Sequence, residues 1–204
     1  MSTPKPYHHG RLRQTLLDIA EEVLHEHGVE ALSIRDLAER AGVSRGAPYR
    51  HFAEKRELEA AVAGRGFSRL CEQFQGVQAL EPERRVEEYS RAILRLAREQ
   101  SNLFKLMFFS DLLTTVWSKP QELVEPADRA FYLFDEAVAA LAPRLDPEGK
   151  RRMTIAAWSA VHGYATLVAW NRLKPFMLGS QQQKQFDEPL LRAVTAAALA
   201  AQSQ

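Results

Sequence analysis

Two short helical segments joined by a glycine turn constrain the fold of this chain more than any other feature. Ser33 precedes the apolar positions of residues 34–38 and can cap a helix that starts at about residue 34. That helix ends at residues 41–43, where Gly42 can adopt a positive φ. Ser44 can then cap a second short helix that runs to about His51. This spacing predicts a helix-turn-helix unit.

The second of these helices has the composition of a helix that enters the major groove of DNA. It reads Ser44-Arg-Gly-Ala-Pro-Tyr-Arg-His-Phe52, and its small residues let the backbone approach a duplex closely. Arg45 can contact a guanine edge or a phosphate, and Tyr49 and His51 can donate hydrogen bonds to phosphate. Pro48 lacks an N–H, so we expect an irregular first turn.

Residues beside this helix extend the predicted contact with DNA. Lys55 and Arg56 lie at the start of the next helix, where backbone amides also favour an anion, and they suggest a phosphate clamp. For Tyr49 we favour exposure to phosphate over a place in the core, and for Phe52 we favour the core.

The motif resembles the TetR family of bacterial transcriptional regulators. The resemblance rests on Ala38-Glu-Arg-Ala-Gly42-Val43-Ser44, then Pro48-Tyr49-Arg-His51-Phe52, and it covers about residues 11–60. It implies DNA binding by a dimer and a helical, ligand-sensing domain over the rest of the chain. The candidate DNA-binding residues are Ser33, Ser44, Arg45, Gly46, Ala47, Tyr49, His51 and Lys55.

The remainder of the sequence is helical in pattern, without strand alternation. A first helix carries apolar positions from Leu12 to Leu24 and stops at Gly28, and a longer helix runs from about Glu54 to Phe74. We predict an all-α fold with an N-terminal arm and helix-turn-helix domain over residues 1–56 and a larger helical domain over residues 57–204. The further predicted helices are Pro82 to Glu99, Asn102 to Phe109, Leu112 to Trp117, Pro120 to Leu141, Pro147 to Leu173 and Gln185 to Ala200, with a loop from Lys174 to Lys184.

The net charge of the chain is close to zero, but two segments are locally basic. The chain has 27 basic and 26 acidic residues, but residues 1–15 and residues 44–56 each carry a local charge of +3. The arm from Lys5 to Arg13, which includes Tyr7, His8 and His9, can follow the DNA backbone or enter the minor groove; the alternative is a disordered terminus without a role.

Other sequence features exclude several classes of protein. One cysteine, Cys71, cannot form an intramolecular disulfide, and its place on an apolar helix side favours a packed thiol over a redox sensor. Metal-binding spacings, nucleotide-binding glycine loops and nucleophile elbows are missing, so we expect no metal, no cofactor and no enzyme. Without a signal peptide or a long apolar stretch, we expect a cytoplasmic protein with no membrane partner.

The second half is rich in aromatic residues, which is typical of a small-molecule pocket between helices and also of an ordinary core. His162 stands among them, either as a ligand contact or as a helix-packing residue. Trp158-Ser-Ala-Val-His162-Gly163 also resembles the Trp-His-Gly signature of one branch of TetR C-terminal domains. The candidate ligand-binding residues are Phe104, Met107, Phe108, Trp117, Phe131, Phe134, Trp158 and His162.

A single recognition helix buries too little surface for tight, specific binding, so we expect a homodimer. The segments 153–173 and 190–199 are more apolar than surface helices need to be and could form a four-helix seam. The leading hypothesis is a transcriptional regulator that a small-molecule effector releases from a palindromic operator, and we favour a repressor over an activator. The alternatives are a DNA-binding dimer without a ligand and a hydrolytic enzyme that uses His162.

Overall fold

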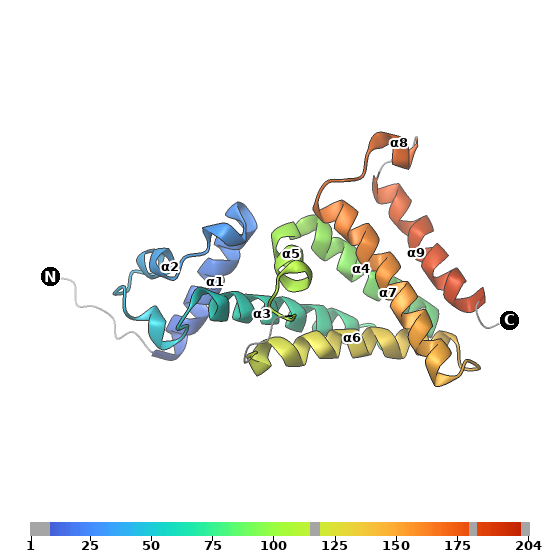
Figure 1. Ribbon diagram of the computed structural model, residues 1–204, viewed down its shortest axis with the longest axis horizontal. Helices are drawn as coiled ribbons and strands as arrows, with labels where there is room; N and C mark the ends of the chain where they lie inside the picture. The colour runs from blue at the N-terminus through green and yellow to red at the C-terminus, as the bar shows by residue number, and fades with distance from the viewer. Residues whose placement is uncertain (1–8, 115–118, 180–182, 201–204) are drawn as a thin grey trace.

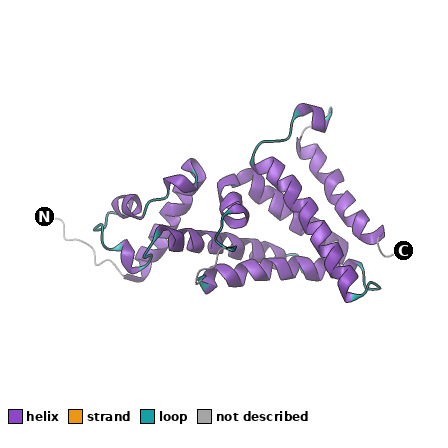
Figure 2. Cartoon of the chain, in the orientation of Figure 1, coloured by secondary structure: helices purple, strands orange, loops and turns teal. Residues whose placement is uncertain are grey.

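The computed structural model describes residues 9–114, 119–179 and 183–200, and every regular element in these ranges is helical (Figures 1 and 2). The all-α prediction is confirmed. The helices are α1 (His9–His27), α2 (Ile34–Arg40), α3 (Lys55–Gln75), α4 (Pro82–Glu99), α5 (Ser101–Phe109), α6 (Gln121–Leu141), α7 (Pro147–Ala169), α8 (Pro175–Leu178) and α9 (Gln183–Ala200), and the 3-10 turns are η1 (Val29–Ala31) and η2 (Pro48–Arg50).

The N-terminal unit forms where the sequence places its caps. Gly28 follows α1 with a φ of 81°, and Gly42 follows α2 with a φ of 68°, so both turns use the left-handed region that glycine tolerates. The Ser33 hydroxyl accepts a hydrogen bond from the Asp36 N–H at 3.3 Å and caps α2. Phe52 is buried in the core of this unit, as predicted.

The segment from Ser44 to His51 is less regular than the predicted helix. The segment is a turn followed by the single 3-10 turn η2. Pro48 has no N–H to donate to the Ser44 carbonyl, so the first helical hydrogen bond cannot form. The backbone bonds of this segment include those from Ala47 N to Ser44 O and from Arg50 N to Ala47 O, and the N–H groups of His51 and Phe52 both donate to Pro48 O.

Helix α3 joins the two halves of the molecule. It begins at the N-terminal unit and runs across the centre of the structure above α6 (Figure 1). The proposed domain boundary after residue 56 therefore falls within the first turn of a continuous helix. Gly64 lets α3 approach α6 so closely that an added Cβ would lie 2.2 Å from the Glu122 carbonyl oxygen.

Helices α4 to α7 form the main body of the C-terminal part, and α9 packs on α4 and α7 (Figure 1). Ion pairs fix α9 in place: Arg91 contacts Glu188 at 2.8 Å, and Arg98 contacts Asp187 at 2.5 Å. Tyr164 of α7 also donates a hydrogen bond to Asp187 at 2.8 Å. Within the described residues, no helix is both long and apolar enough to cross a membrane.

The main differences between the predicted and observed boundaries lie in three places. Residues 111–114 form a turn rather than a helix, and residues 115–117 of that prediction lie outside the described part. Helix α7 ends at Ala169 instead of Leu173, because the chain turns at Asn171 with a φ of 52°. The predicted loop from residue 174 contains the short helix α8.

Candidate DNA-binding surface and aromatic cluster

The segment from Ser44 to Phe52 presents polar groups on one side and packs apolar groups on the other. Ser44, Arg45 and Gly46 are exposed, and the Tyr49 side chain is the large aromatic group of this turn that faces solvent, at 52% exposure. Pro48 is buried beneath it. The contrast between exposed Tyr49 and buried Phe52 is the contrast that the sequence predicts.

The other candidate residues of this unit lie at its edges. Ala47 is half-buried and packs against the core, and His51 is half-buried at the end of η2. Ser33 caps α2, and its hydroxyl hydrogen remains available as a donor. Arg50 is exposed on the same turn as Tyr49. It was not among the predicted contacts, because its neighbours in sequence do not show which way it faces.

Lys55 stands at the first position of α3, where the helix N-terminus favours anions. Its side chain is 40% exposed, and its ammonium lies 3.7 Å from the Glu59 carboxylate. Burial raises the pKa of Glu59, and the Lys55 charge opposes that rise. This weak, partly exposed pair leaves the Lys55 ammonium able to turn toward a phosphate.

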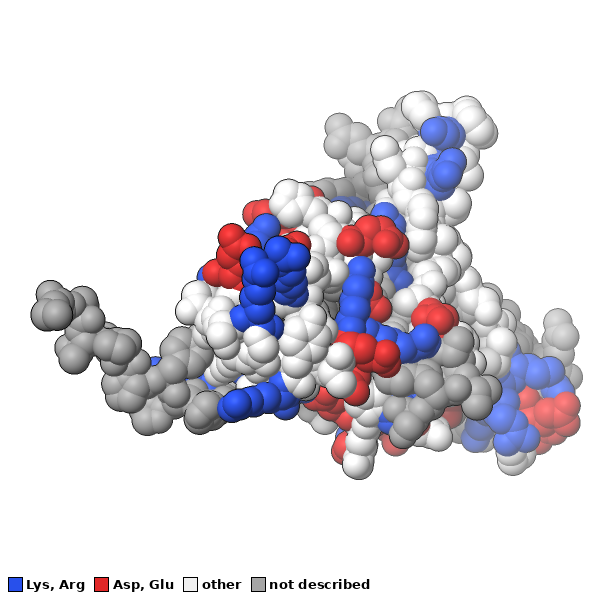
Figure 3. Space-filling model, turned by 60° about the vertical axis from the view of Figure 1, so that its left-hand side comes forward, with Lys and Arg blue, Asp and Glu red and all other residues white. Residues whose placement is uncertain are grey.

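Basic side chains lie on the N-terminal end of the molecule and also on other parts of its surface. Figure 3 shows them on the face that comes forward, with acidic groups among them. The arm residues Lys5, Tyr7 and His8 lie outside the described part, as does the side chain of His9. The described surface is therefore formed by η2, the turn before it and the start of α3.

Two arginines of the locally basic segments face the C-terminal half instead. Arg56 contacts Asp111 in the turn after α5, at 3.1 Å to the carboxylate and 3.2 Å to the backbone oxygen. Arg13 of α1 pairs with Glu122 at the start of α6. The sequence predicts Arg56 in the phosphate clamp; in the structure its guanidinium ties the N-terminal unit to the turn after α5.

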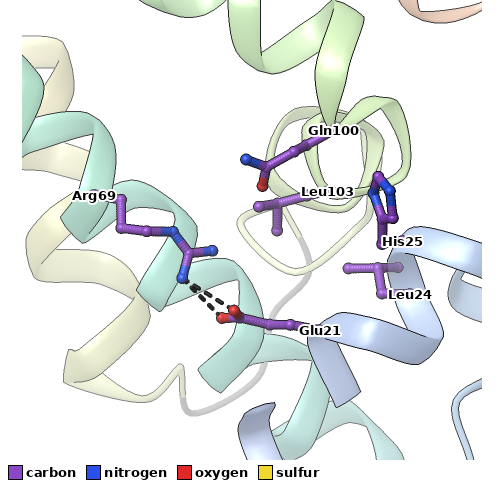
Figure 4. Close-up of a pocket in the computed structure, with 6 residues that line it drawn as sticks. All are labelled: Glu21, Leu24, His25, Arg69, Gln100 and Leu103. Carbon is purple, nitrogen blue, oxygen red and sulfur yellow. Dashed lines mark hydrogen bonds and ion pairs between the residues drawn. The ribbon is translucent and has the colours of Figure 1, made fainter. Parts of the chain in front are cut away.

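A small cavity with both polar and apolar lining residues lies where α1, α3 and the start of α5 meet (Figure 4). Arg69 and Glu21 form a double hydrogen bond at its edge, at 3.0 and 3.1 Å, while His25 and Gln100 approach from the other side. Its volume of about 30 Å³ would hold a water molecule but not an effector. The cavity therefore belongs to the junction between the two halves.

Six of the eight candidate ligand residues form one aromatic cluster between α5, α6 and α7. The Trp158 ring is central: its centroid lies 4.0 Å from His162, 5.1 Å from Phe134 and 5.4 Å from Phe131. The cluster continues through Phe108, 4.7 Å from His162, to Phe104.

The other two candidates are not in this cluster. Met107 packs toward α3, with its sulfur over Gly66, and Trp117 lies outside the described residues.

His162 has one bonded and one unbonded ring nitrogen. Nδ1 lies 3.1 Å from the Trp158 carbonyl oxygen, whereas Nε2 is buried and has no hydrogen-bond partner among the described residues. Burial lowers the pKa of His162 to about 4. The imidazole is therefore neutral near pH 7.

This lowered pKa predicts a loss of stability in acid. The unfolded chain binds a proton at its ordinary pKa near 6.5 and the folded chain only near 4, so stability is full above about pH 6.5 and falls as the pH drops toward 4. Between pH 7 and pH 4.5, we expect His162 to account for a loss of roughly 2–3 kcal/mol in the free energy of unfolding. Urea denaturation of wild type and His162→Phe at both pH values measures it.

Carboxylates titrate in the same range, so the readout is the difference between the two proteins. A wild type and variant with the same loss of stability between pH 7 and pH 4.5 would contradict the assignment of a buried, neutral His162.

Cys71 is buried on α3, and its thiol donates to the Pro126 carbonyl at 3.3 Å. Burial raises the pKa of Cys71. A thiol with a raised pKa is a poor nucleophile, which agrees with the predicted packed thiol.

Two family models match this chain. The model described as "Bacterial regulatory proteins, tetR family" matches residues 16–62, and the model described as "Tetracyclin repressor-like, C-terminal domain" matches residues 86–199. The first match contains the turn and the α3 start described above, and the second contains the aromatic cluster.

Similar sequences and structures agree with these matches. The transcriptional repressor AcnR of Corynebacterium efficiens is 40% identical over 60 residues, which are 29% of this chain and 32% of AcnR. The chain thus spans about a third of the length of the curated relatives it matches first. A protein with unknown function from Rhodococcus sp. RHA1 is 29% identical, with a TM-score of 0.77 over 98% of this chain and 100% of that one.

A more distant structure shares the fold. The crystal structure of AibR, in complex with isovaleryl coenzyme A and operator DNA, has a TM-score of 0.62 at 16% identity and covers 91% of this chain and 97% of AibR.

Proposed function

The chain belongs to the TetR family of bacterial regulatory proteins, and from this we propose that it is a cytoplasmic transcriptional regulator that binds a palindromic operator as a dimer. The carrying observation is the surface around η2. Tyr49 and Arg45 are exposed there, with Lys55 beside them, inside the segment that the family model matches. Of the candidate set, we assign Tyr49 and Lys55 to phosphate and Arg45 to a base edge or a phosphate. Ser33, Ser44, Gly46, Ala47 and His51 complete the proposed contact surface.

We propose repression as the mode of regulation. AcnR, which matches the N-terminal part, is a transcriptional repressor, and AibR was solved with operator DNA. A bound dimer over a promoter would block transcription by occupying the site.

The proposed dimer seam is the outer face of α7. Ile155 is 56% exposed, and Ala156, Ser159, Ala160 and Gly163 continue an exposed row of small residues along the helix. A Cβ added at Gly163 would meet nothing within 4 Å in the single chain. Helix α9, which the Arg91 and Arg98 ion pairs hold against α4 and which also packs on α7, exposes Ala193 and Ala196. Small side chains permit the close helix approach that a four-helix seam requires.

An arginine in this seam should separate the protomers. We expect wild type to sediment as a dimer that binds one operator duplex, and Ala160→Arg to sediment as a monomer. Its operator affinity should fall at least about 100-fold, because a single unit loses half of the contacts. Sedimentation velocity, with and without a duplex selected from a random library, measures both effects.

Ala140→Arg is the matched control, since Ala140 is an exposed alanine on α6, away from this row. It should remain dimeric. A dimeric Ala160→Arg variant, or a monomeric wild type that binds the duplex tightly, would contradict the proposed assembly.

We place the effector at the aromatic cluster of Phe104, Phe108, Phe131, Phe134, Trp158 and His162. Helix α5 carries Phe104 and Phe108 and ends beside Asp111, which holds Arg56. Helix α6 carries Phe131 and Phe134 and, in its first turn, Glu122, which pairs with Arg13. A ligand that separates α5 from α6 would thus act on both ion pairs and change the position of the DNA-binding unit.

We also assign the C-terminal part to the Trp-His-Gly branch. Three observations support this: the Trp158 and His162 rings are in contact, the His162 Nδ1 bonds back to Trp158, and Gly163 follows on the exposed side of α7. A dimer that organises DNA without an effector is the second candidate. It is favoured by the direct ring contacts within the cluster, which are also those of a packed core.

A further inference from the structure

The hydrogen bond of His162 defines its tautomer. A carbonyl oxygen only accepts hydrogen bonds, so the ring nitrogen 3.1 Å from the Trp158 oxygen, Nδ1, must carry the hydrogen. In a neutral imidazole the other nitrogen then holds a lone pair. Nε2 of His162 is therefore an acceptor, and it is buried without a donor among the described residues.

The ring neighbours of His162 do not supply that donor. Phe104 and Phe108 carry no polar atom, and their centroids lie 6.3 and 4.7 Å from the imidazole. The Trp158 indole is tilted by 34° from the imidazole, with the ring centroids 4.0 Å apart, and its N–H makes no hydrogen bond to Nε2. Burying an acceptor without a partner is unfavourable, and such an atom calls for an explanation.

The surroundings of Nε2 suit an uncharged aromatic molecule. Phe104 and Phe134 are fully buried, whereas Phe108, Phe131 and Trp158 are half-buried, so the cluster extends from the core to the surface. Flat rings in edge and stacked contacts favour another flat ring. The desolvation that lowers the pKa of His162 would equally oppose a charged group on a ligand.

We propose that the effector is an uncharged aromatic compound whose N–H or O–H donates a hydrogen bond to the His162 Nε2. This inference rests on the proposed function, because it specifies the ligand of the cluster placed there. The bond would satisfy the buried acceptor, and the ring would pack against the half-buried aromatic side chains of α5, α6 and α7.

A matched pair of probes tests the donor. 4-Propylphenol and 4-propylanisole have the same ring and chain, but only the phenol has an O–H. We expect calorimetric titration to show that wild type binds the phenol roughly tenfold more tightly, which corresponds to about 1.4 kcal/mol. Quenching of tryptophan fluorescence provides a second readout, since Trp158 contacts His162.

Two substitutions separate the acceptor from the shape of the residue. His162→Phe keeps a flat ring without an acceptor, so it should bind both probes equally. His162→Gln keeps an acceptor near the position of Nε2 and should retain a preference for the phenol; it also serves if the Phe variant fails to fold. His27→Phe is the control, because His27 is an exposed histidine on α1, and it should behave as wild type.

Equal affinity of wild type for the two probes would overturn the inference, as would binding of neither probe or a phenol preference that persists in His162→Phe. The operator affinity of the ligand-free protein is measured separately. A protein that prefers the phenol but binds no operator would overturn the proposed function and keep the ligand chemistry. A protein that binds its operator but neither probe would overturn the ligand chemistry and keep the proposed function.

Discussion

Alanine in place of Gly64 is expected to lower the free energy of unfolding by about 2–4 kcal/mol, the range of severe overpacking. The added Cβ would lie 2.2 Å from the Glu122 carbonyl oxygen and 3.0 Å from the carbonyl carbon, so the backbone of α6 must move. Pro126 has no N–H to offer that carbonyl, which leaves the oxygen facing α3. Urea denaturation at pH 7 measures the effect.

Gly66→Ala provides the matched comparison in the same helix. Its Cβ would meet the Met107 side chain, with the sulfur at 2.5 Å, and a methionine side chain can rotate aside. Both variants gain the same helix propensity from alanine, about 1 kcal/mol. We expect Gly66→Ala to lose clearly less stability than Gly64→Ala, and equal losses would contradict the backbone contact.

Gly64→Ala should also affect DNA binding at temperatures where the variant is still folded. The contact between α3 and α6 joins the DNA-binding unit to the body of the molecule, and the Arg13 ion pair to Glu122 lies at the same end of α6. A shift of α6 would therefore change the positions of the DNA-binding unit and of the Arg13–Glu122 ion pair.

Removal of either proposed phosphate contact should strongly weaken operator binding. A hydrogen bond to a charged phosphate contributes about 1.5 kcal/mol, and a dimer makes each contact twice. We thus expect Tyr49→Phe and Lys55→Gln each to weaken operator binding by roughly 100-fold. Fluorescence anisotropy with a labelled operator duplex at several salt concentrations measures the affinities.

The salt dependence distinguishes the two contacts. Lys55→Gln removes two positive charges from the dimer, so the slope of log affinity against log salt should fall by about 2. Tyr49→Phe removes a neutral donor and should leave the slope unchanged. Tyr49 is 52% exposed and the Lys55 side chain is 40% exposed, so neither substitution should change the free energy of unfolding much.

Arg144→Gln is the control for charge, because Arg144 is an exposed cation in the turn between α6 and α7, far from η2. Its affinity should stay within about twofold of wild type. If the Lys55 and Arg144 variants had equal effects, general electrostatic attraction would replace the assigned contact.

Local signals predicted much of the fold. The bounds of α4 are those expected from Pro82 and Glu99, and α2 begins after the Ser33 cap as predicted. Gly28 and Gly42 end their helices with positive φ. Each of these features depends on neighbours within a few residues, which a single sequence displays. The regularity of the recognition segment was mispredicted because the effect of Pro48 extended over the whole segment rather than its first turn.

The contacts of the candidate sites were harder to predict from the sequence. The exposure of Tyr49 and the burial of Phe52 follow from the pattern of a short helical unit. The ion pairs of Arg13 with Glu122 and Arg56 with Asp111 join residues 109 and 55 positions apart, and a charge pattern does not show such partners. The same holds for the position of Met107, which contacts α3 rather than the aromatic cluster.

The most direct test of the central claim is selection of duplexes from a random library by the purified protein, followed by anisotropy titration of the enriched sequence at several salt concentrations. We predict enrichment of a palindrome with two half-sites, bound by one dimer with a steep salt dependence. Failure to enrich any sequence, with weak binding at every salt concentration, would contradict the assignment of this protein as an operator-binding regulator.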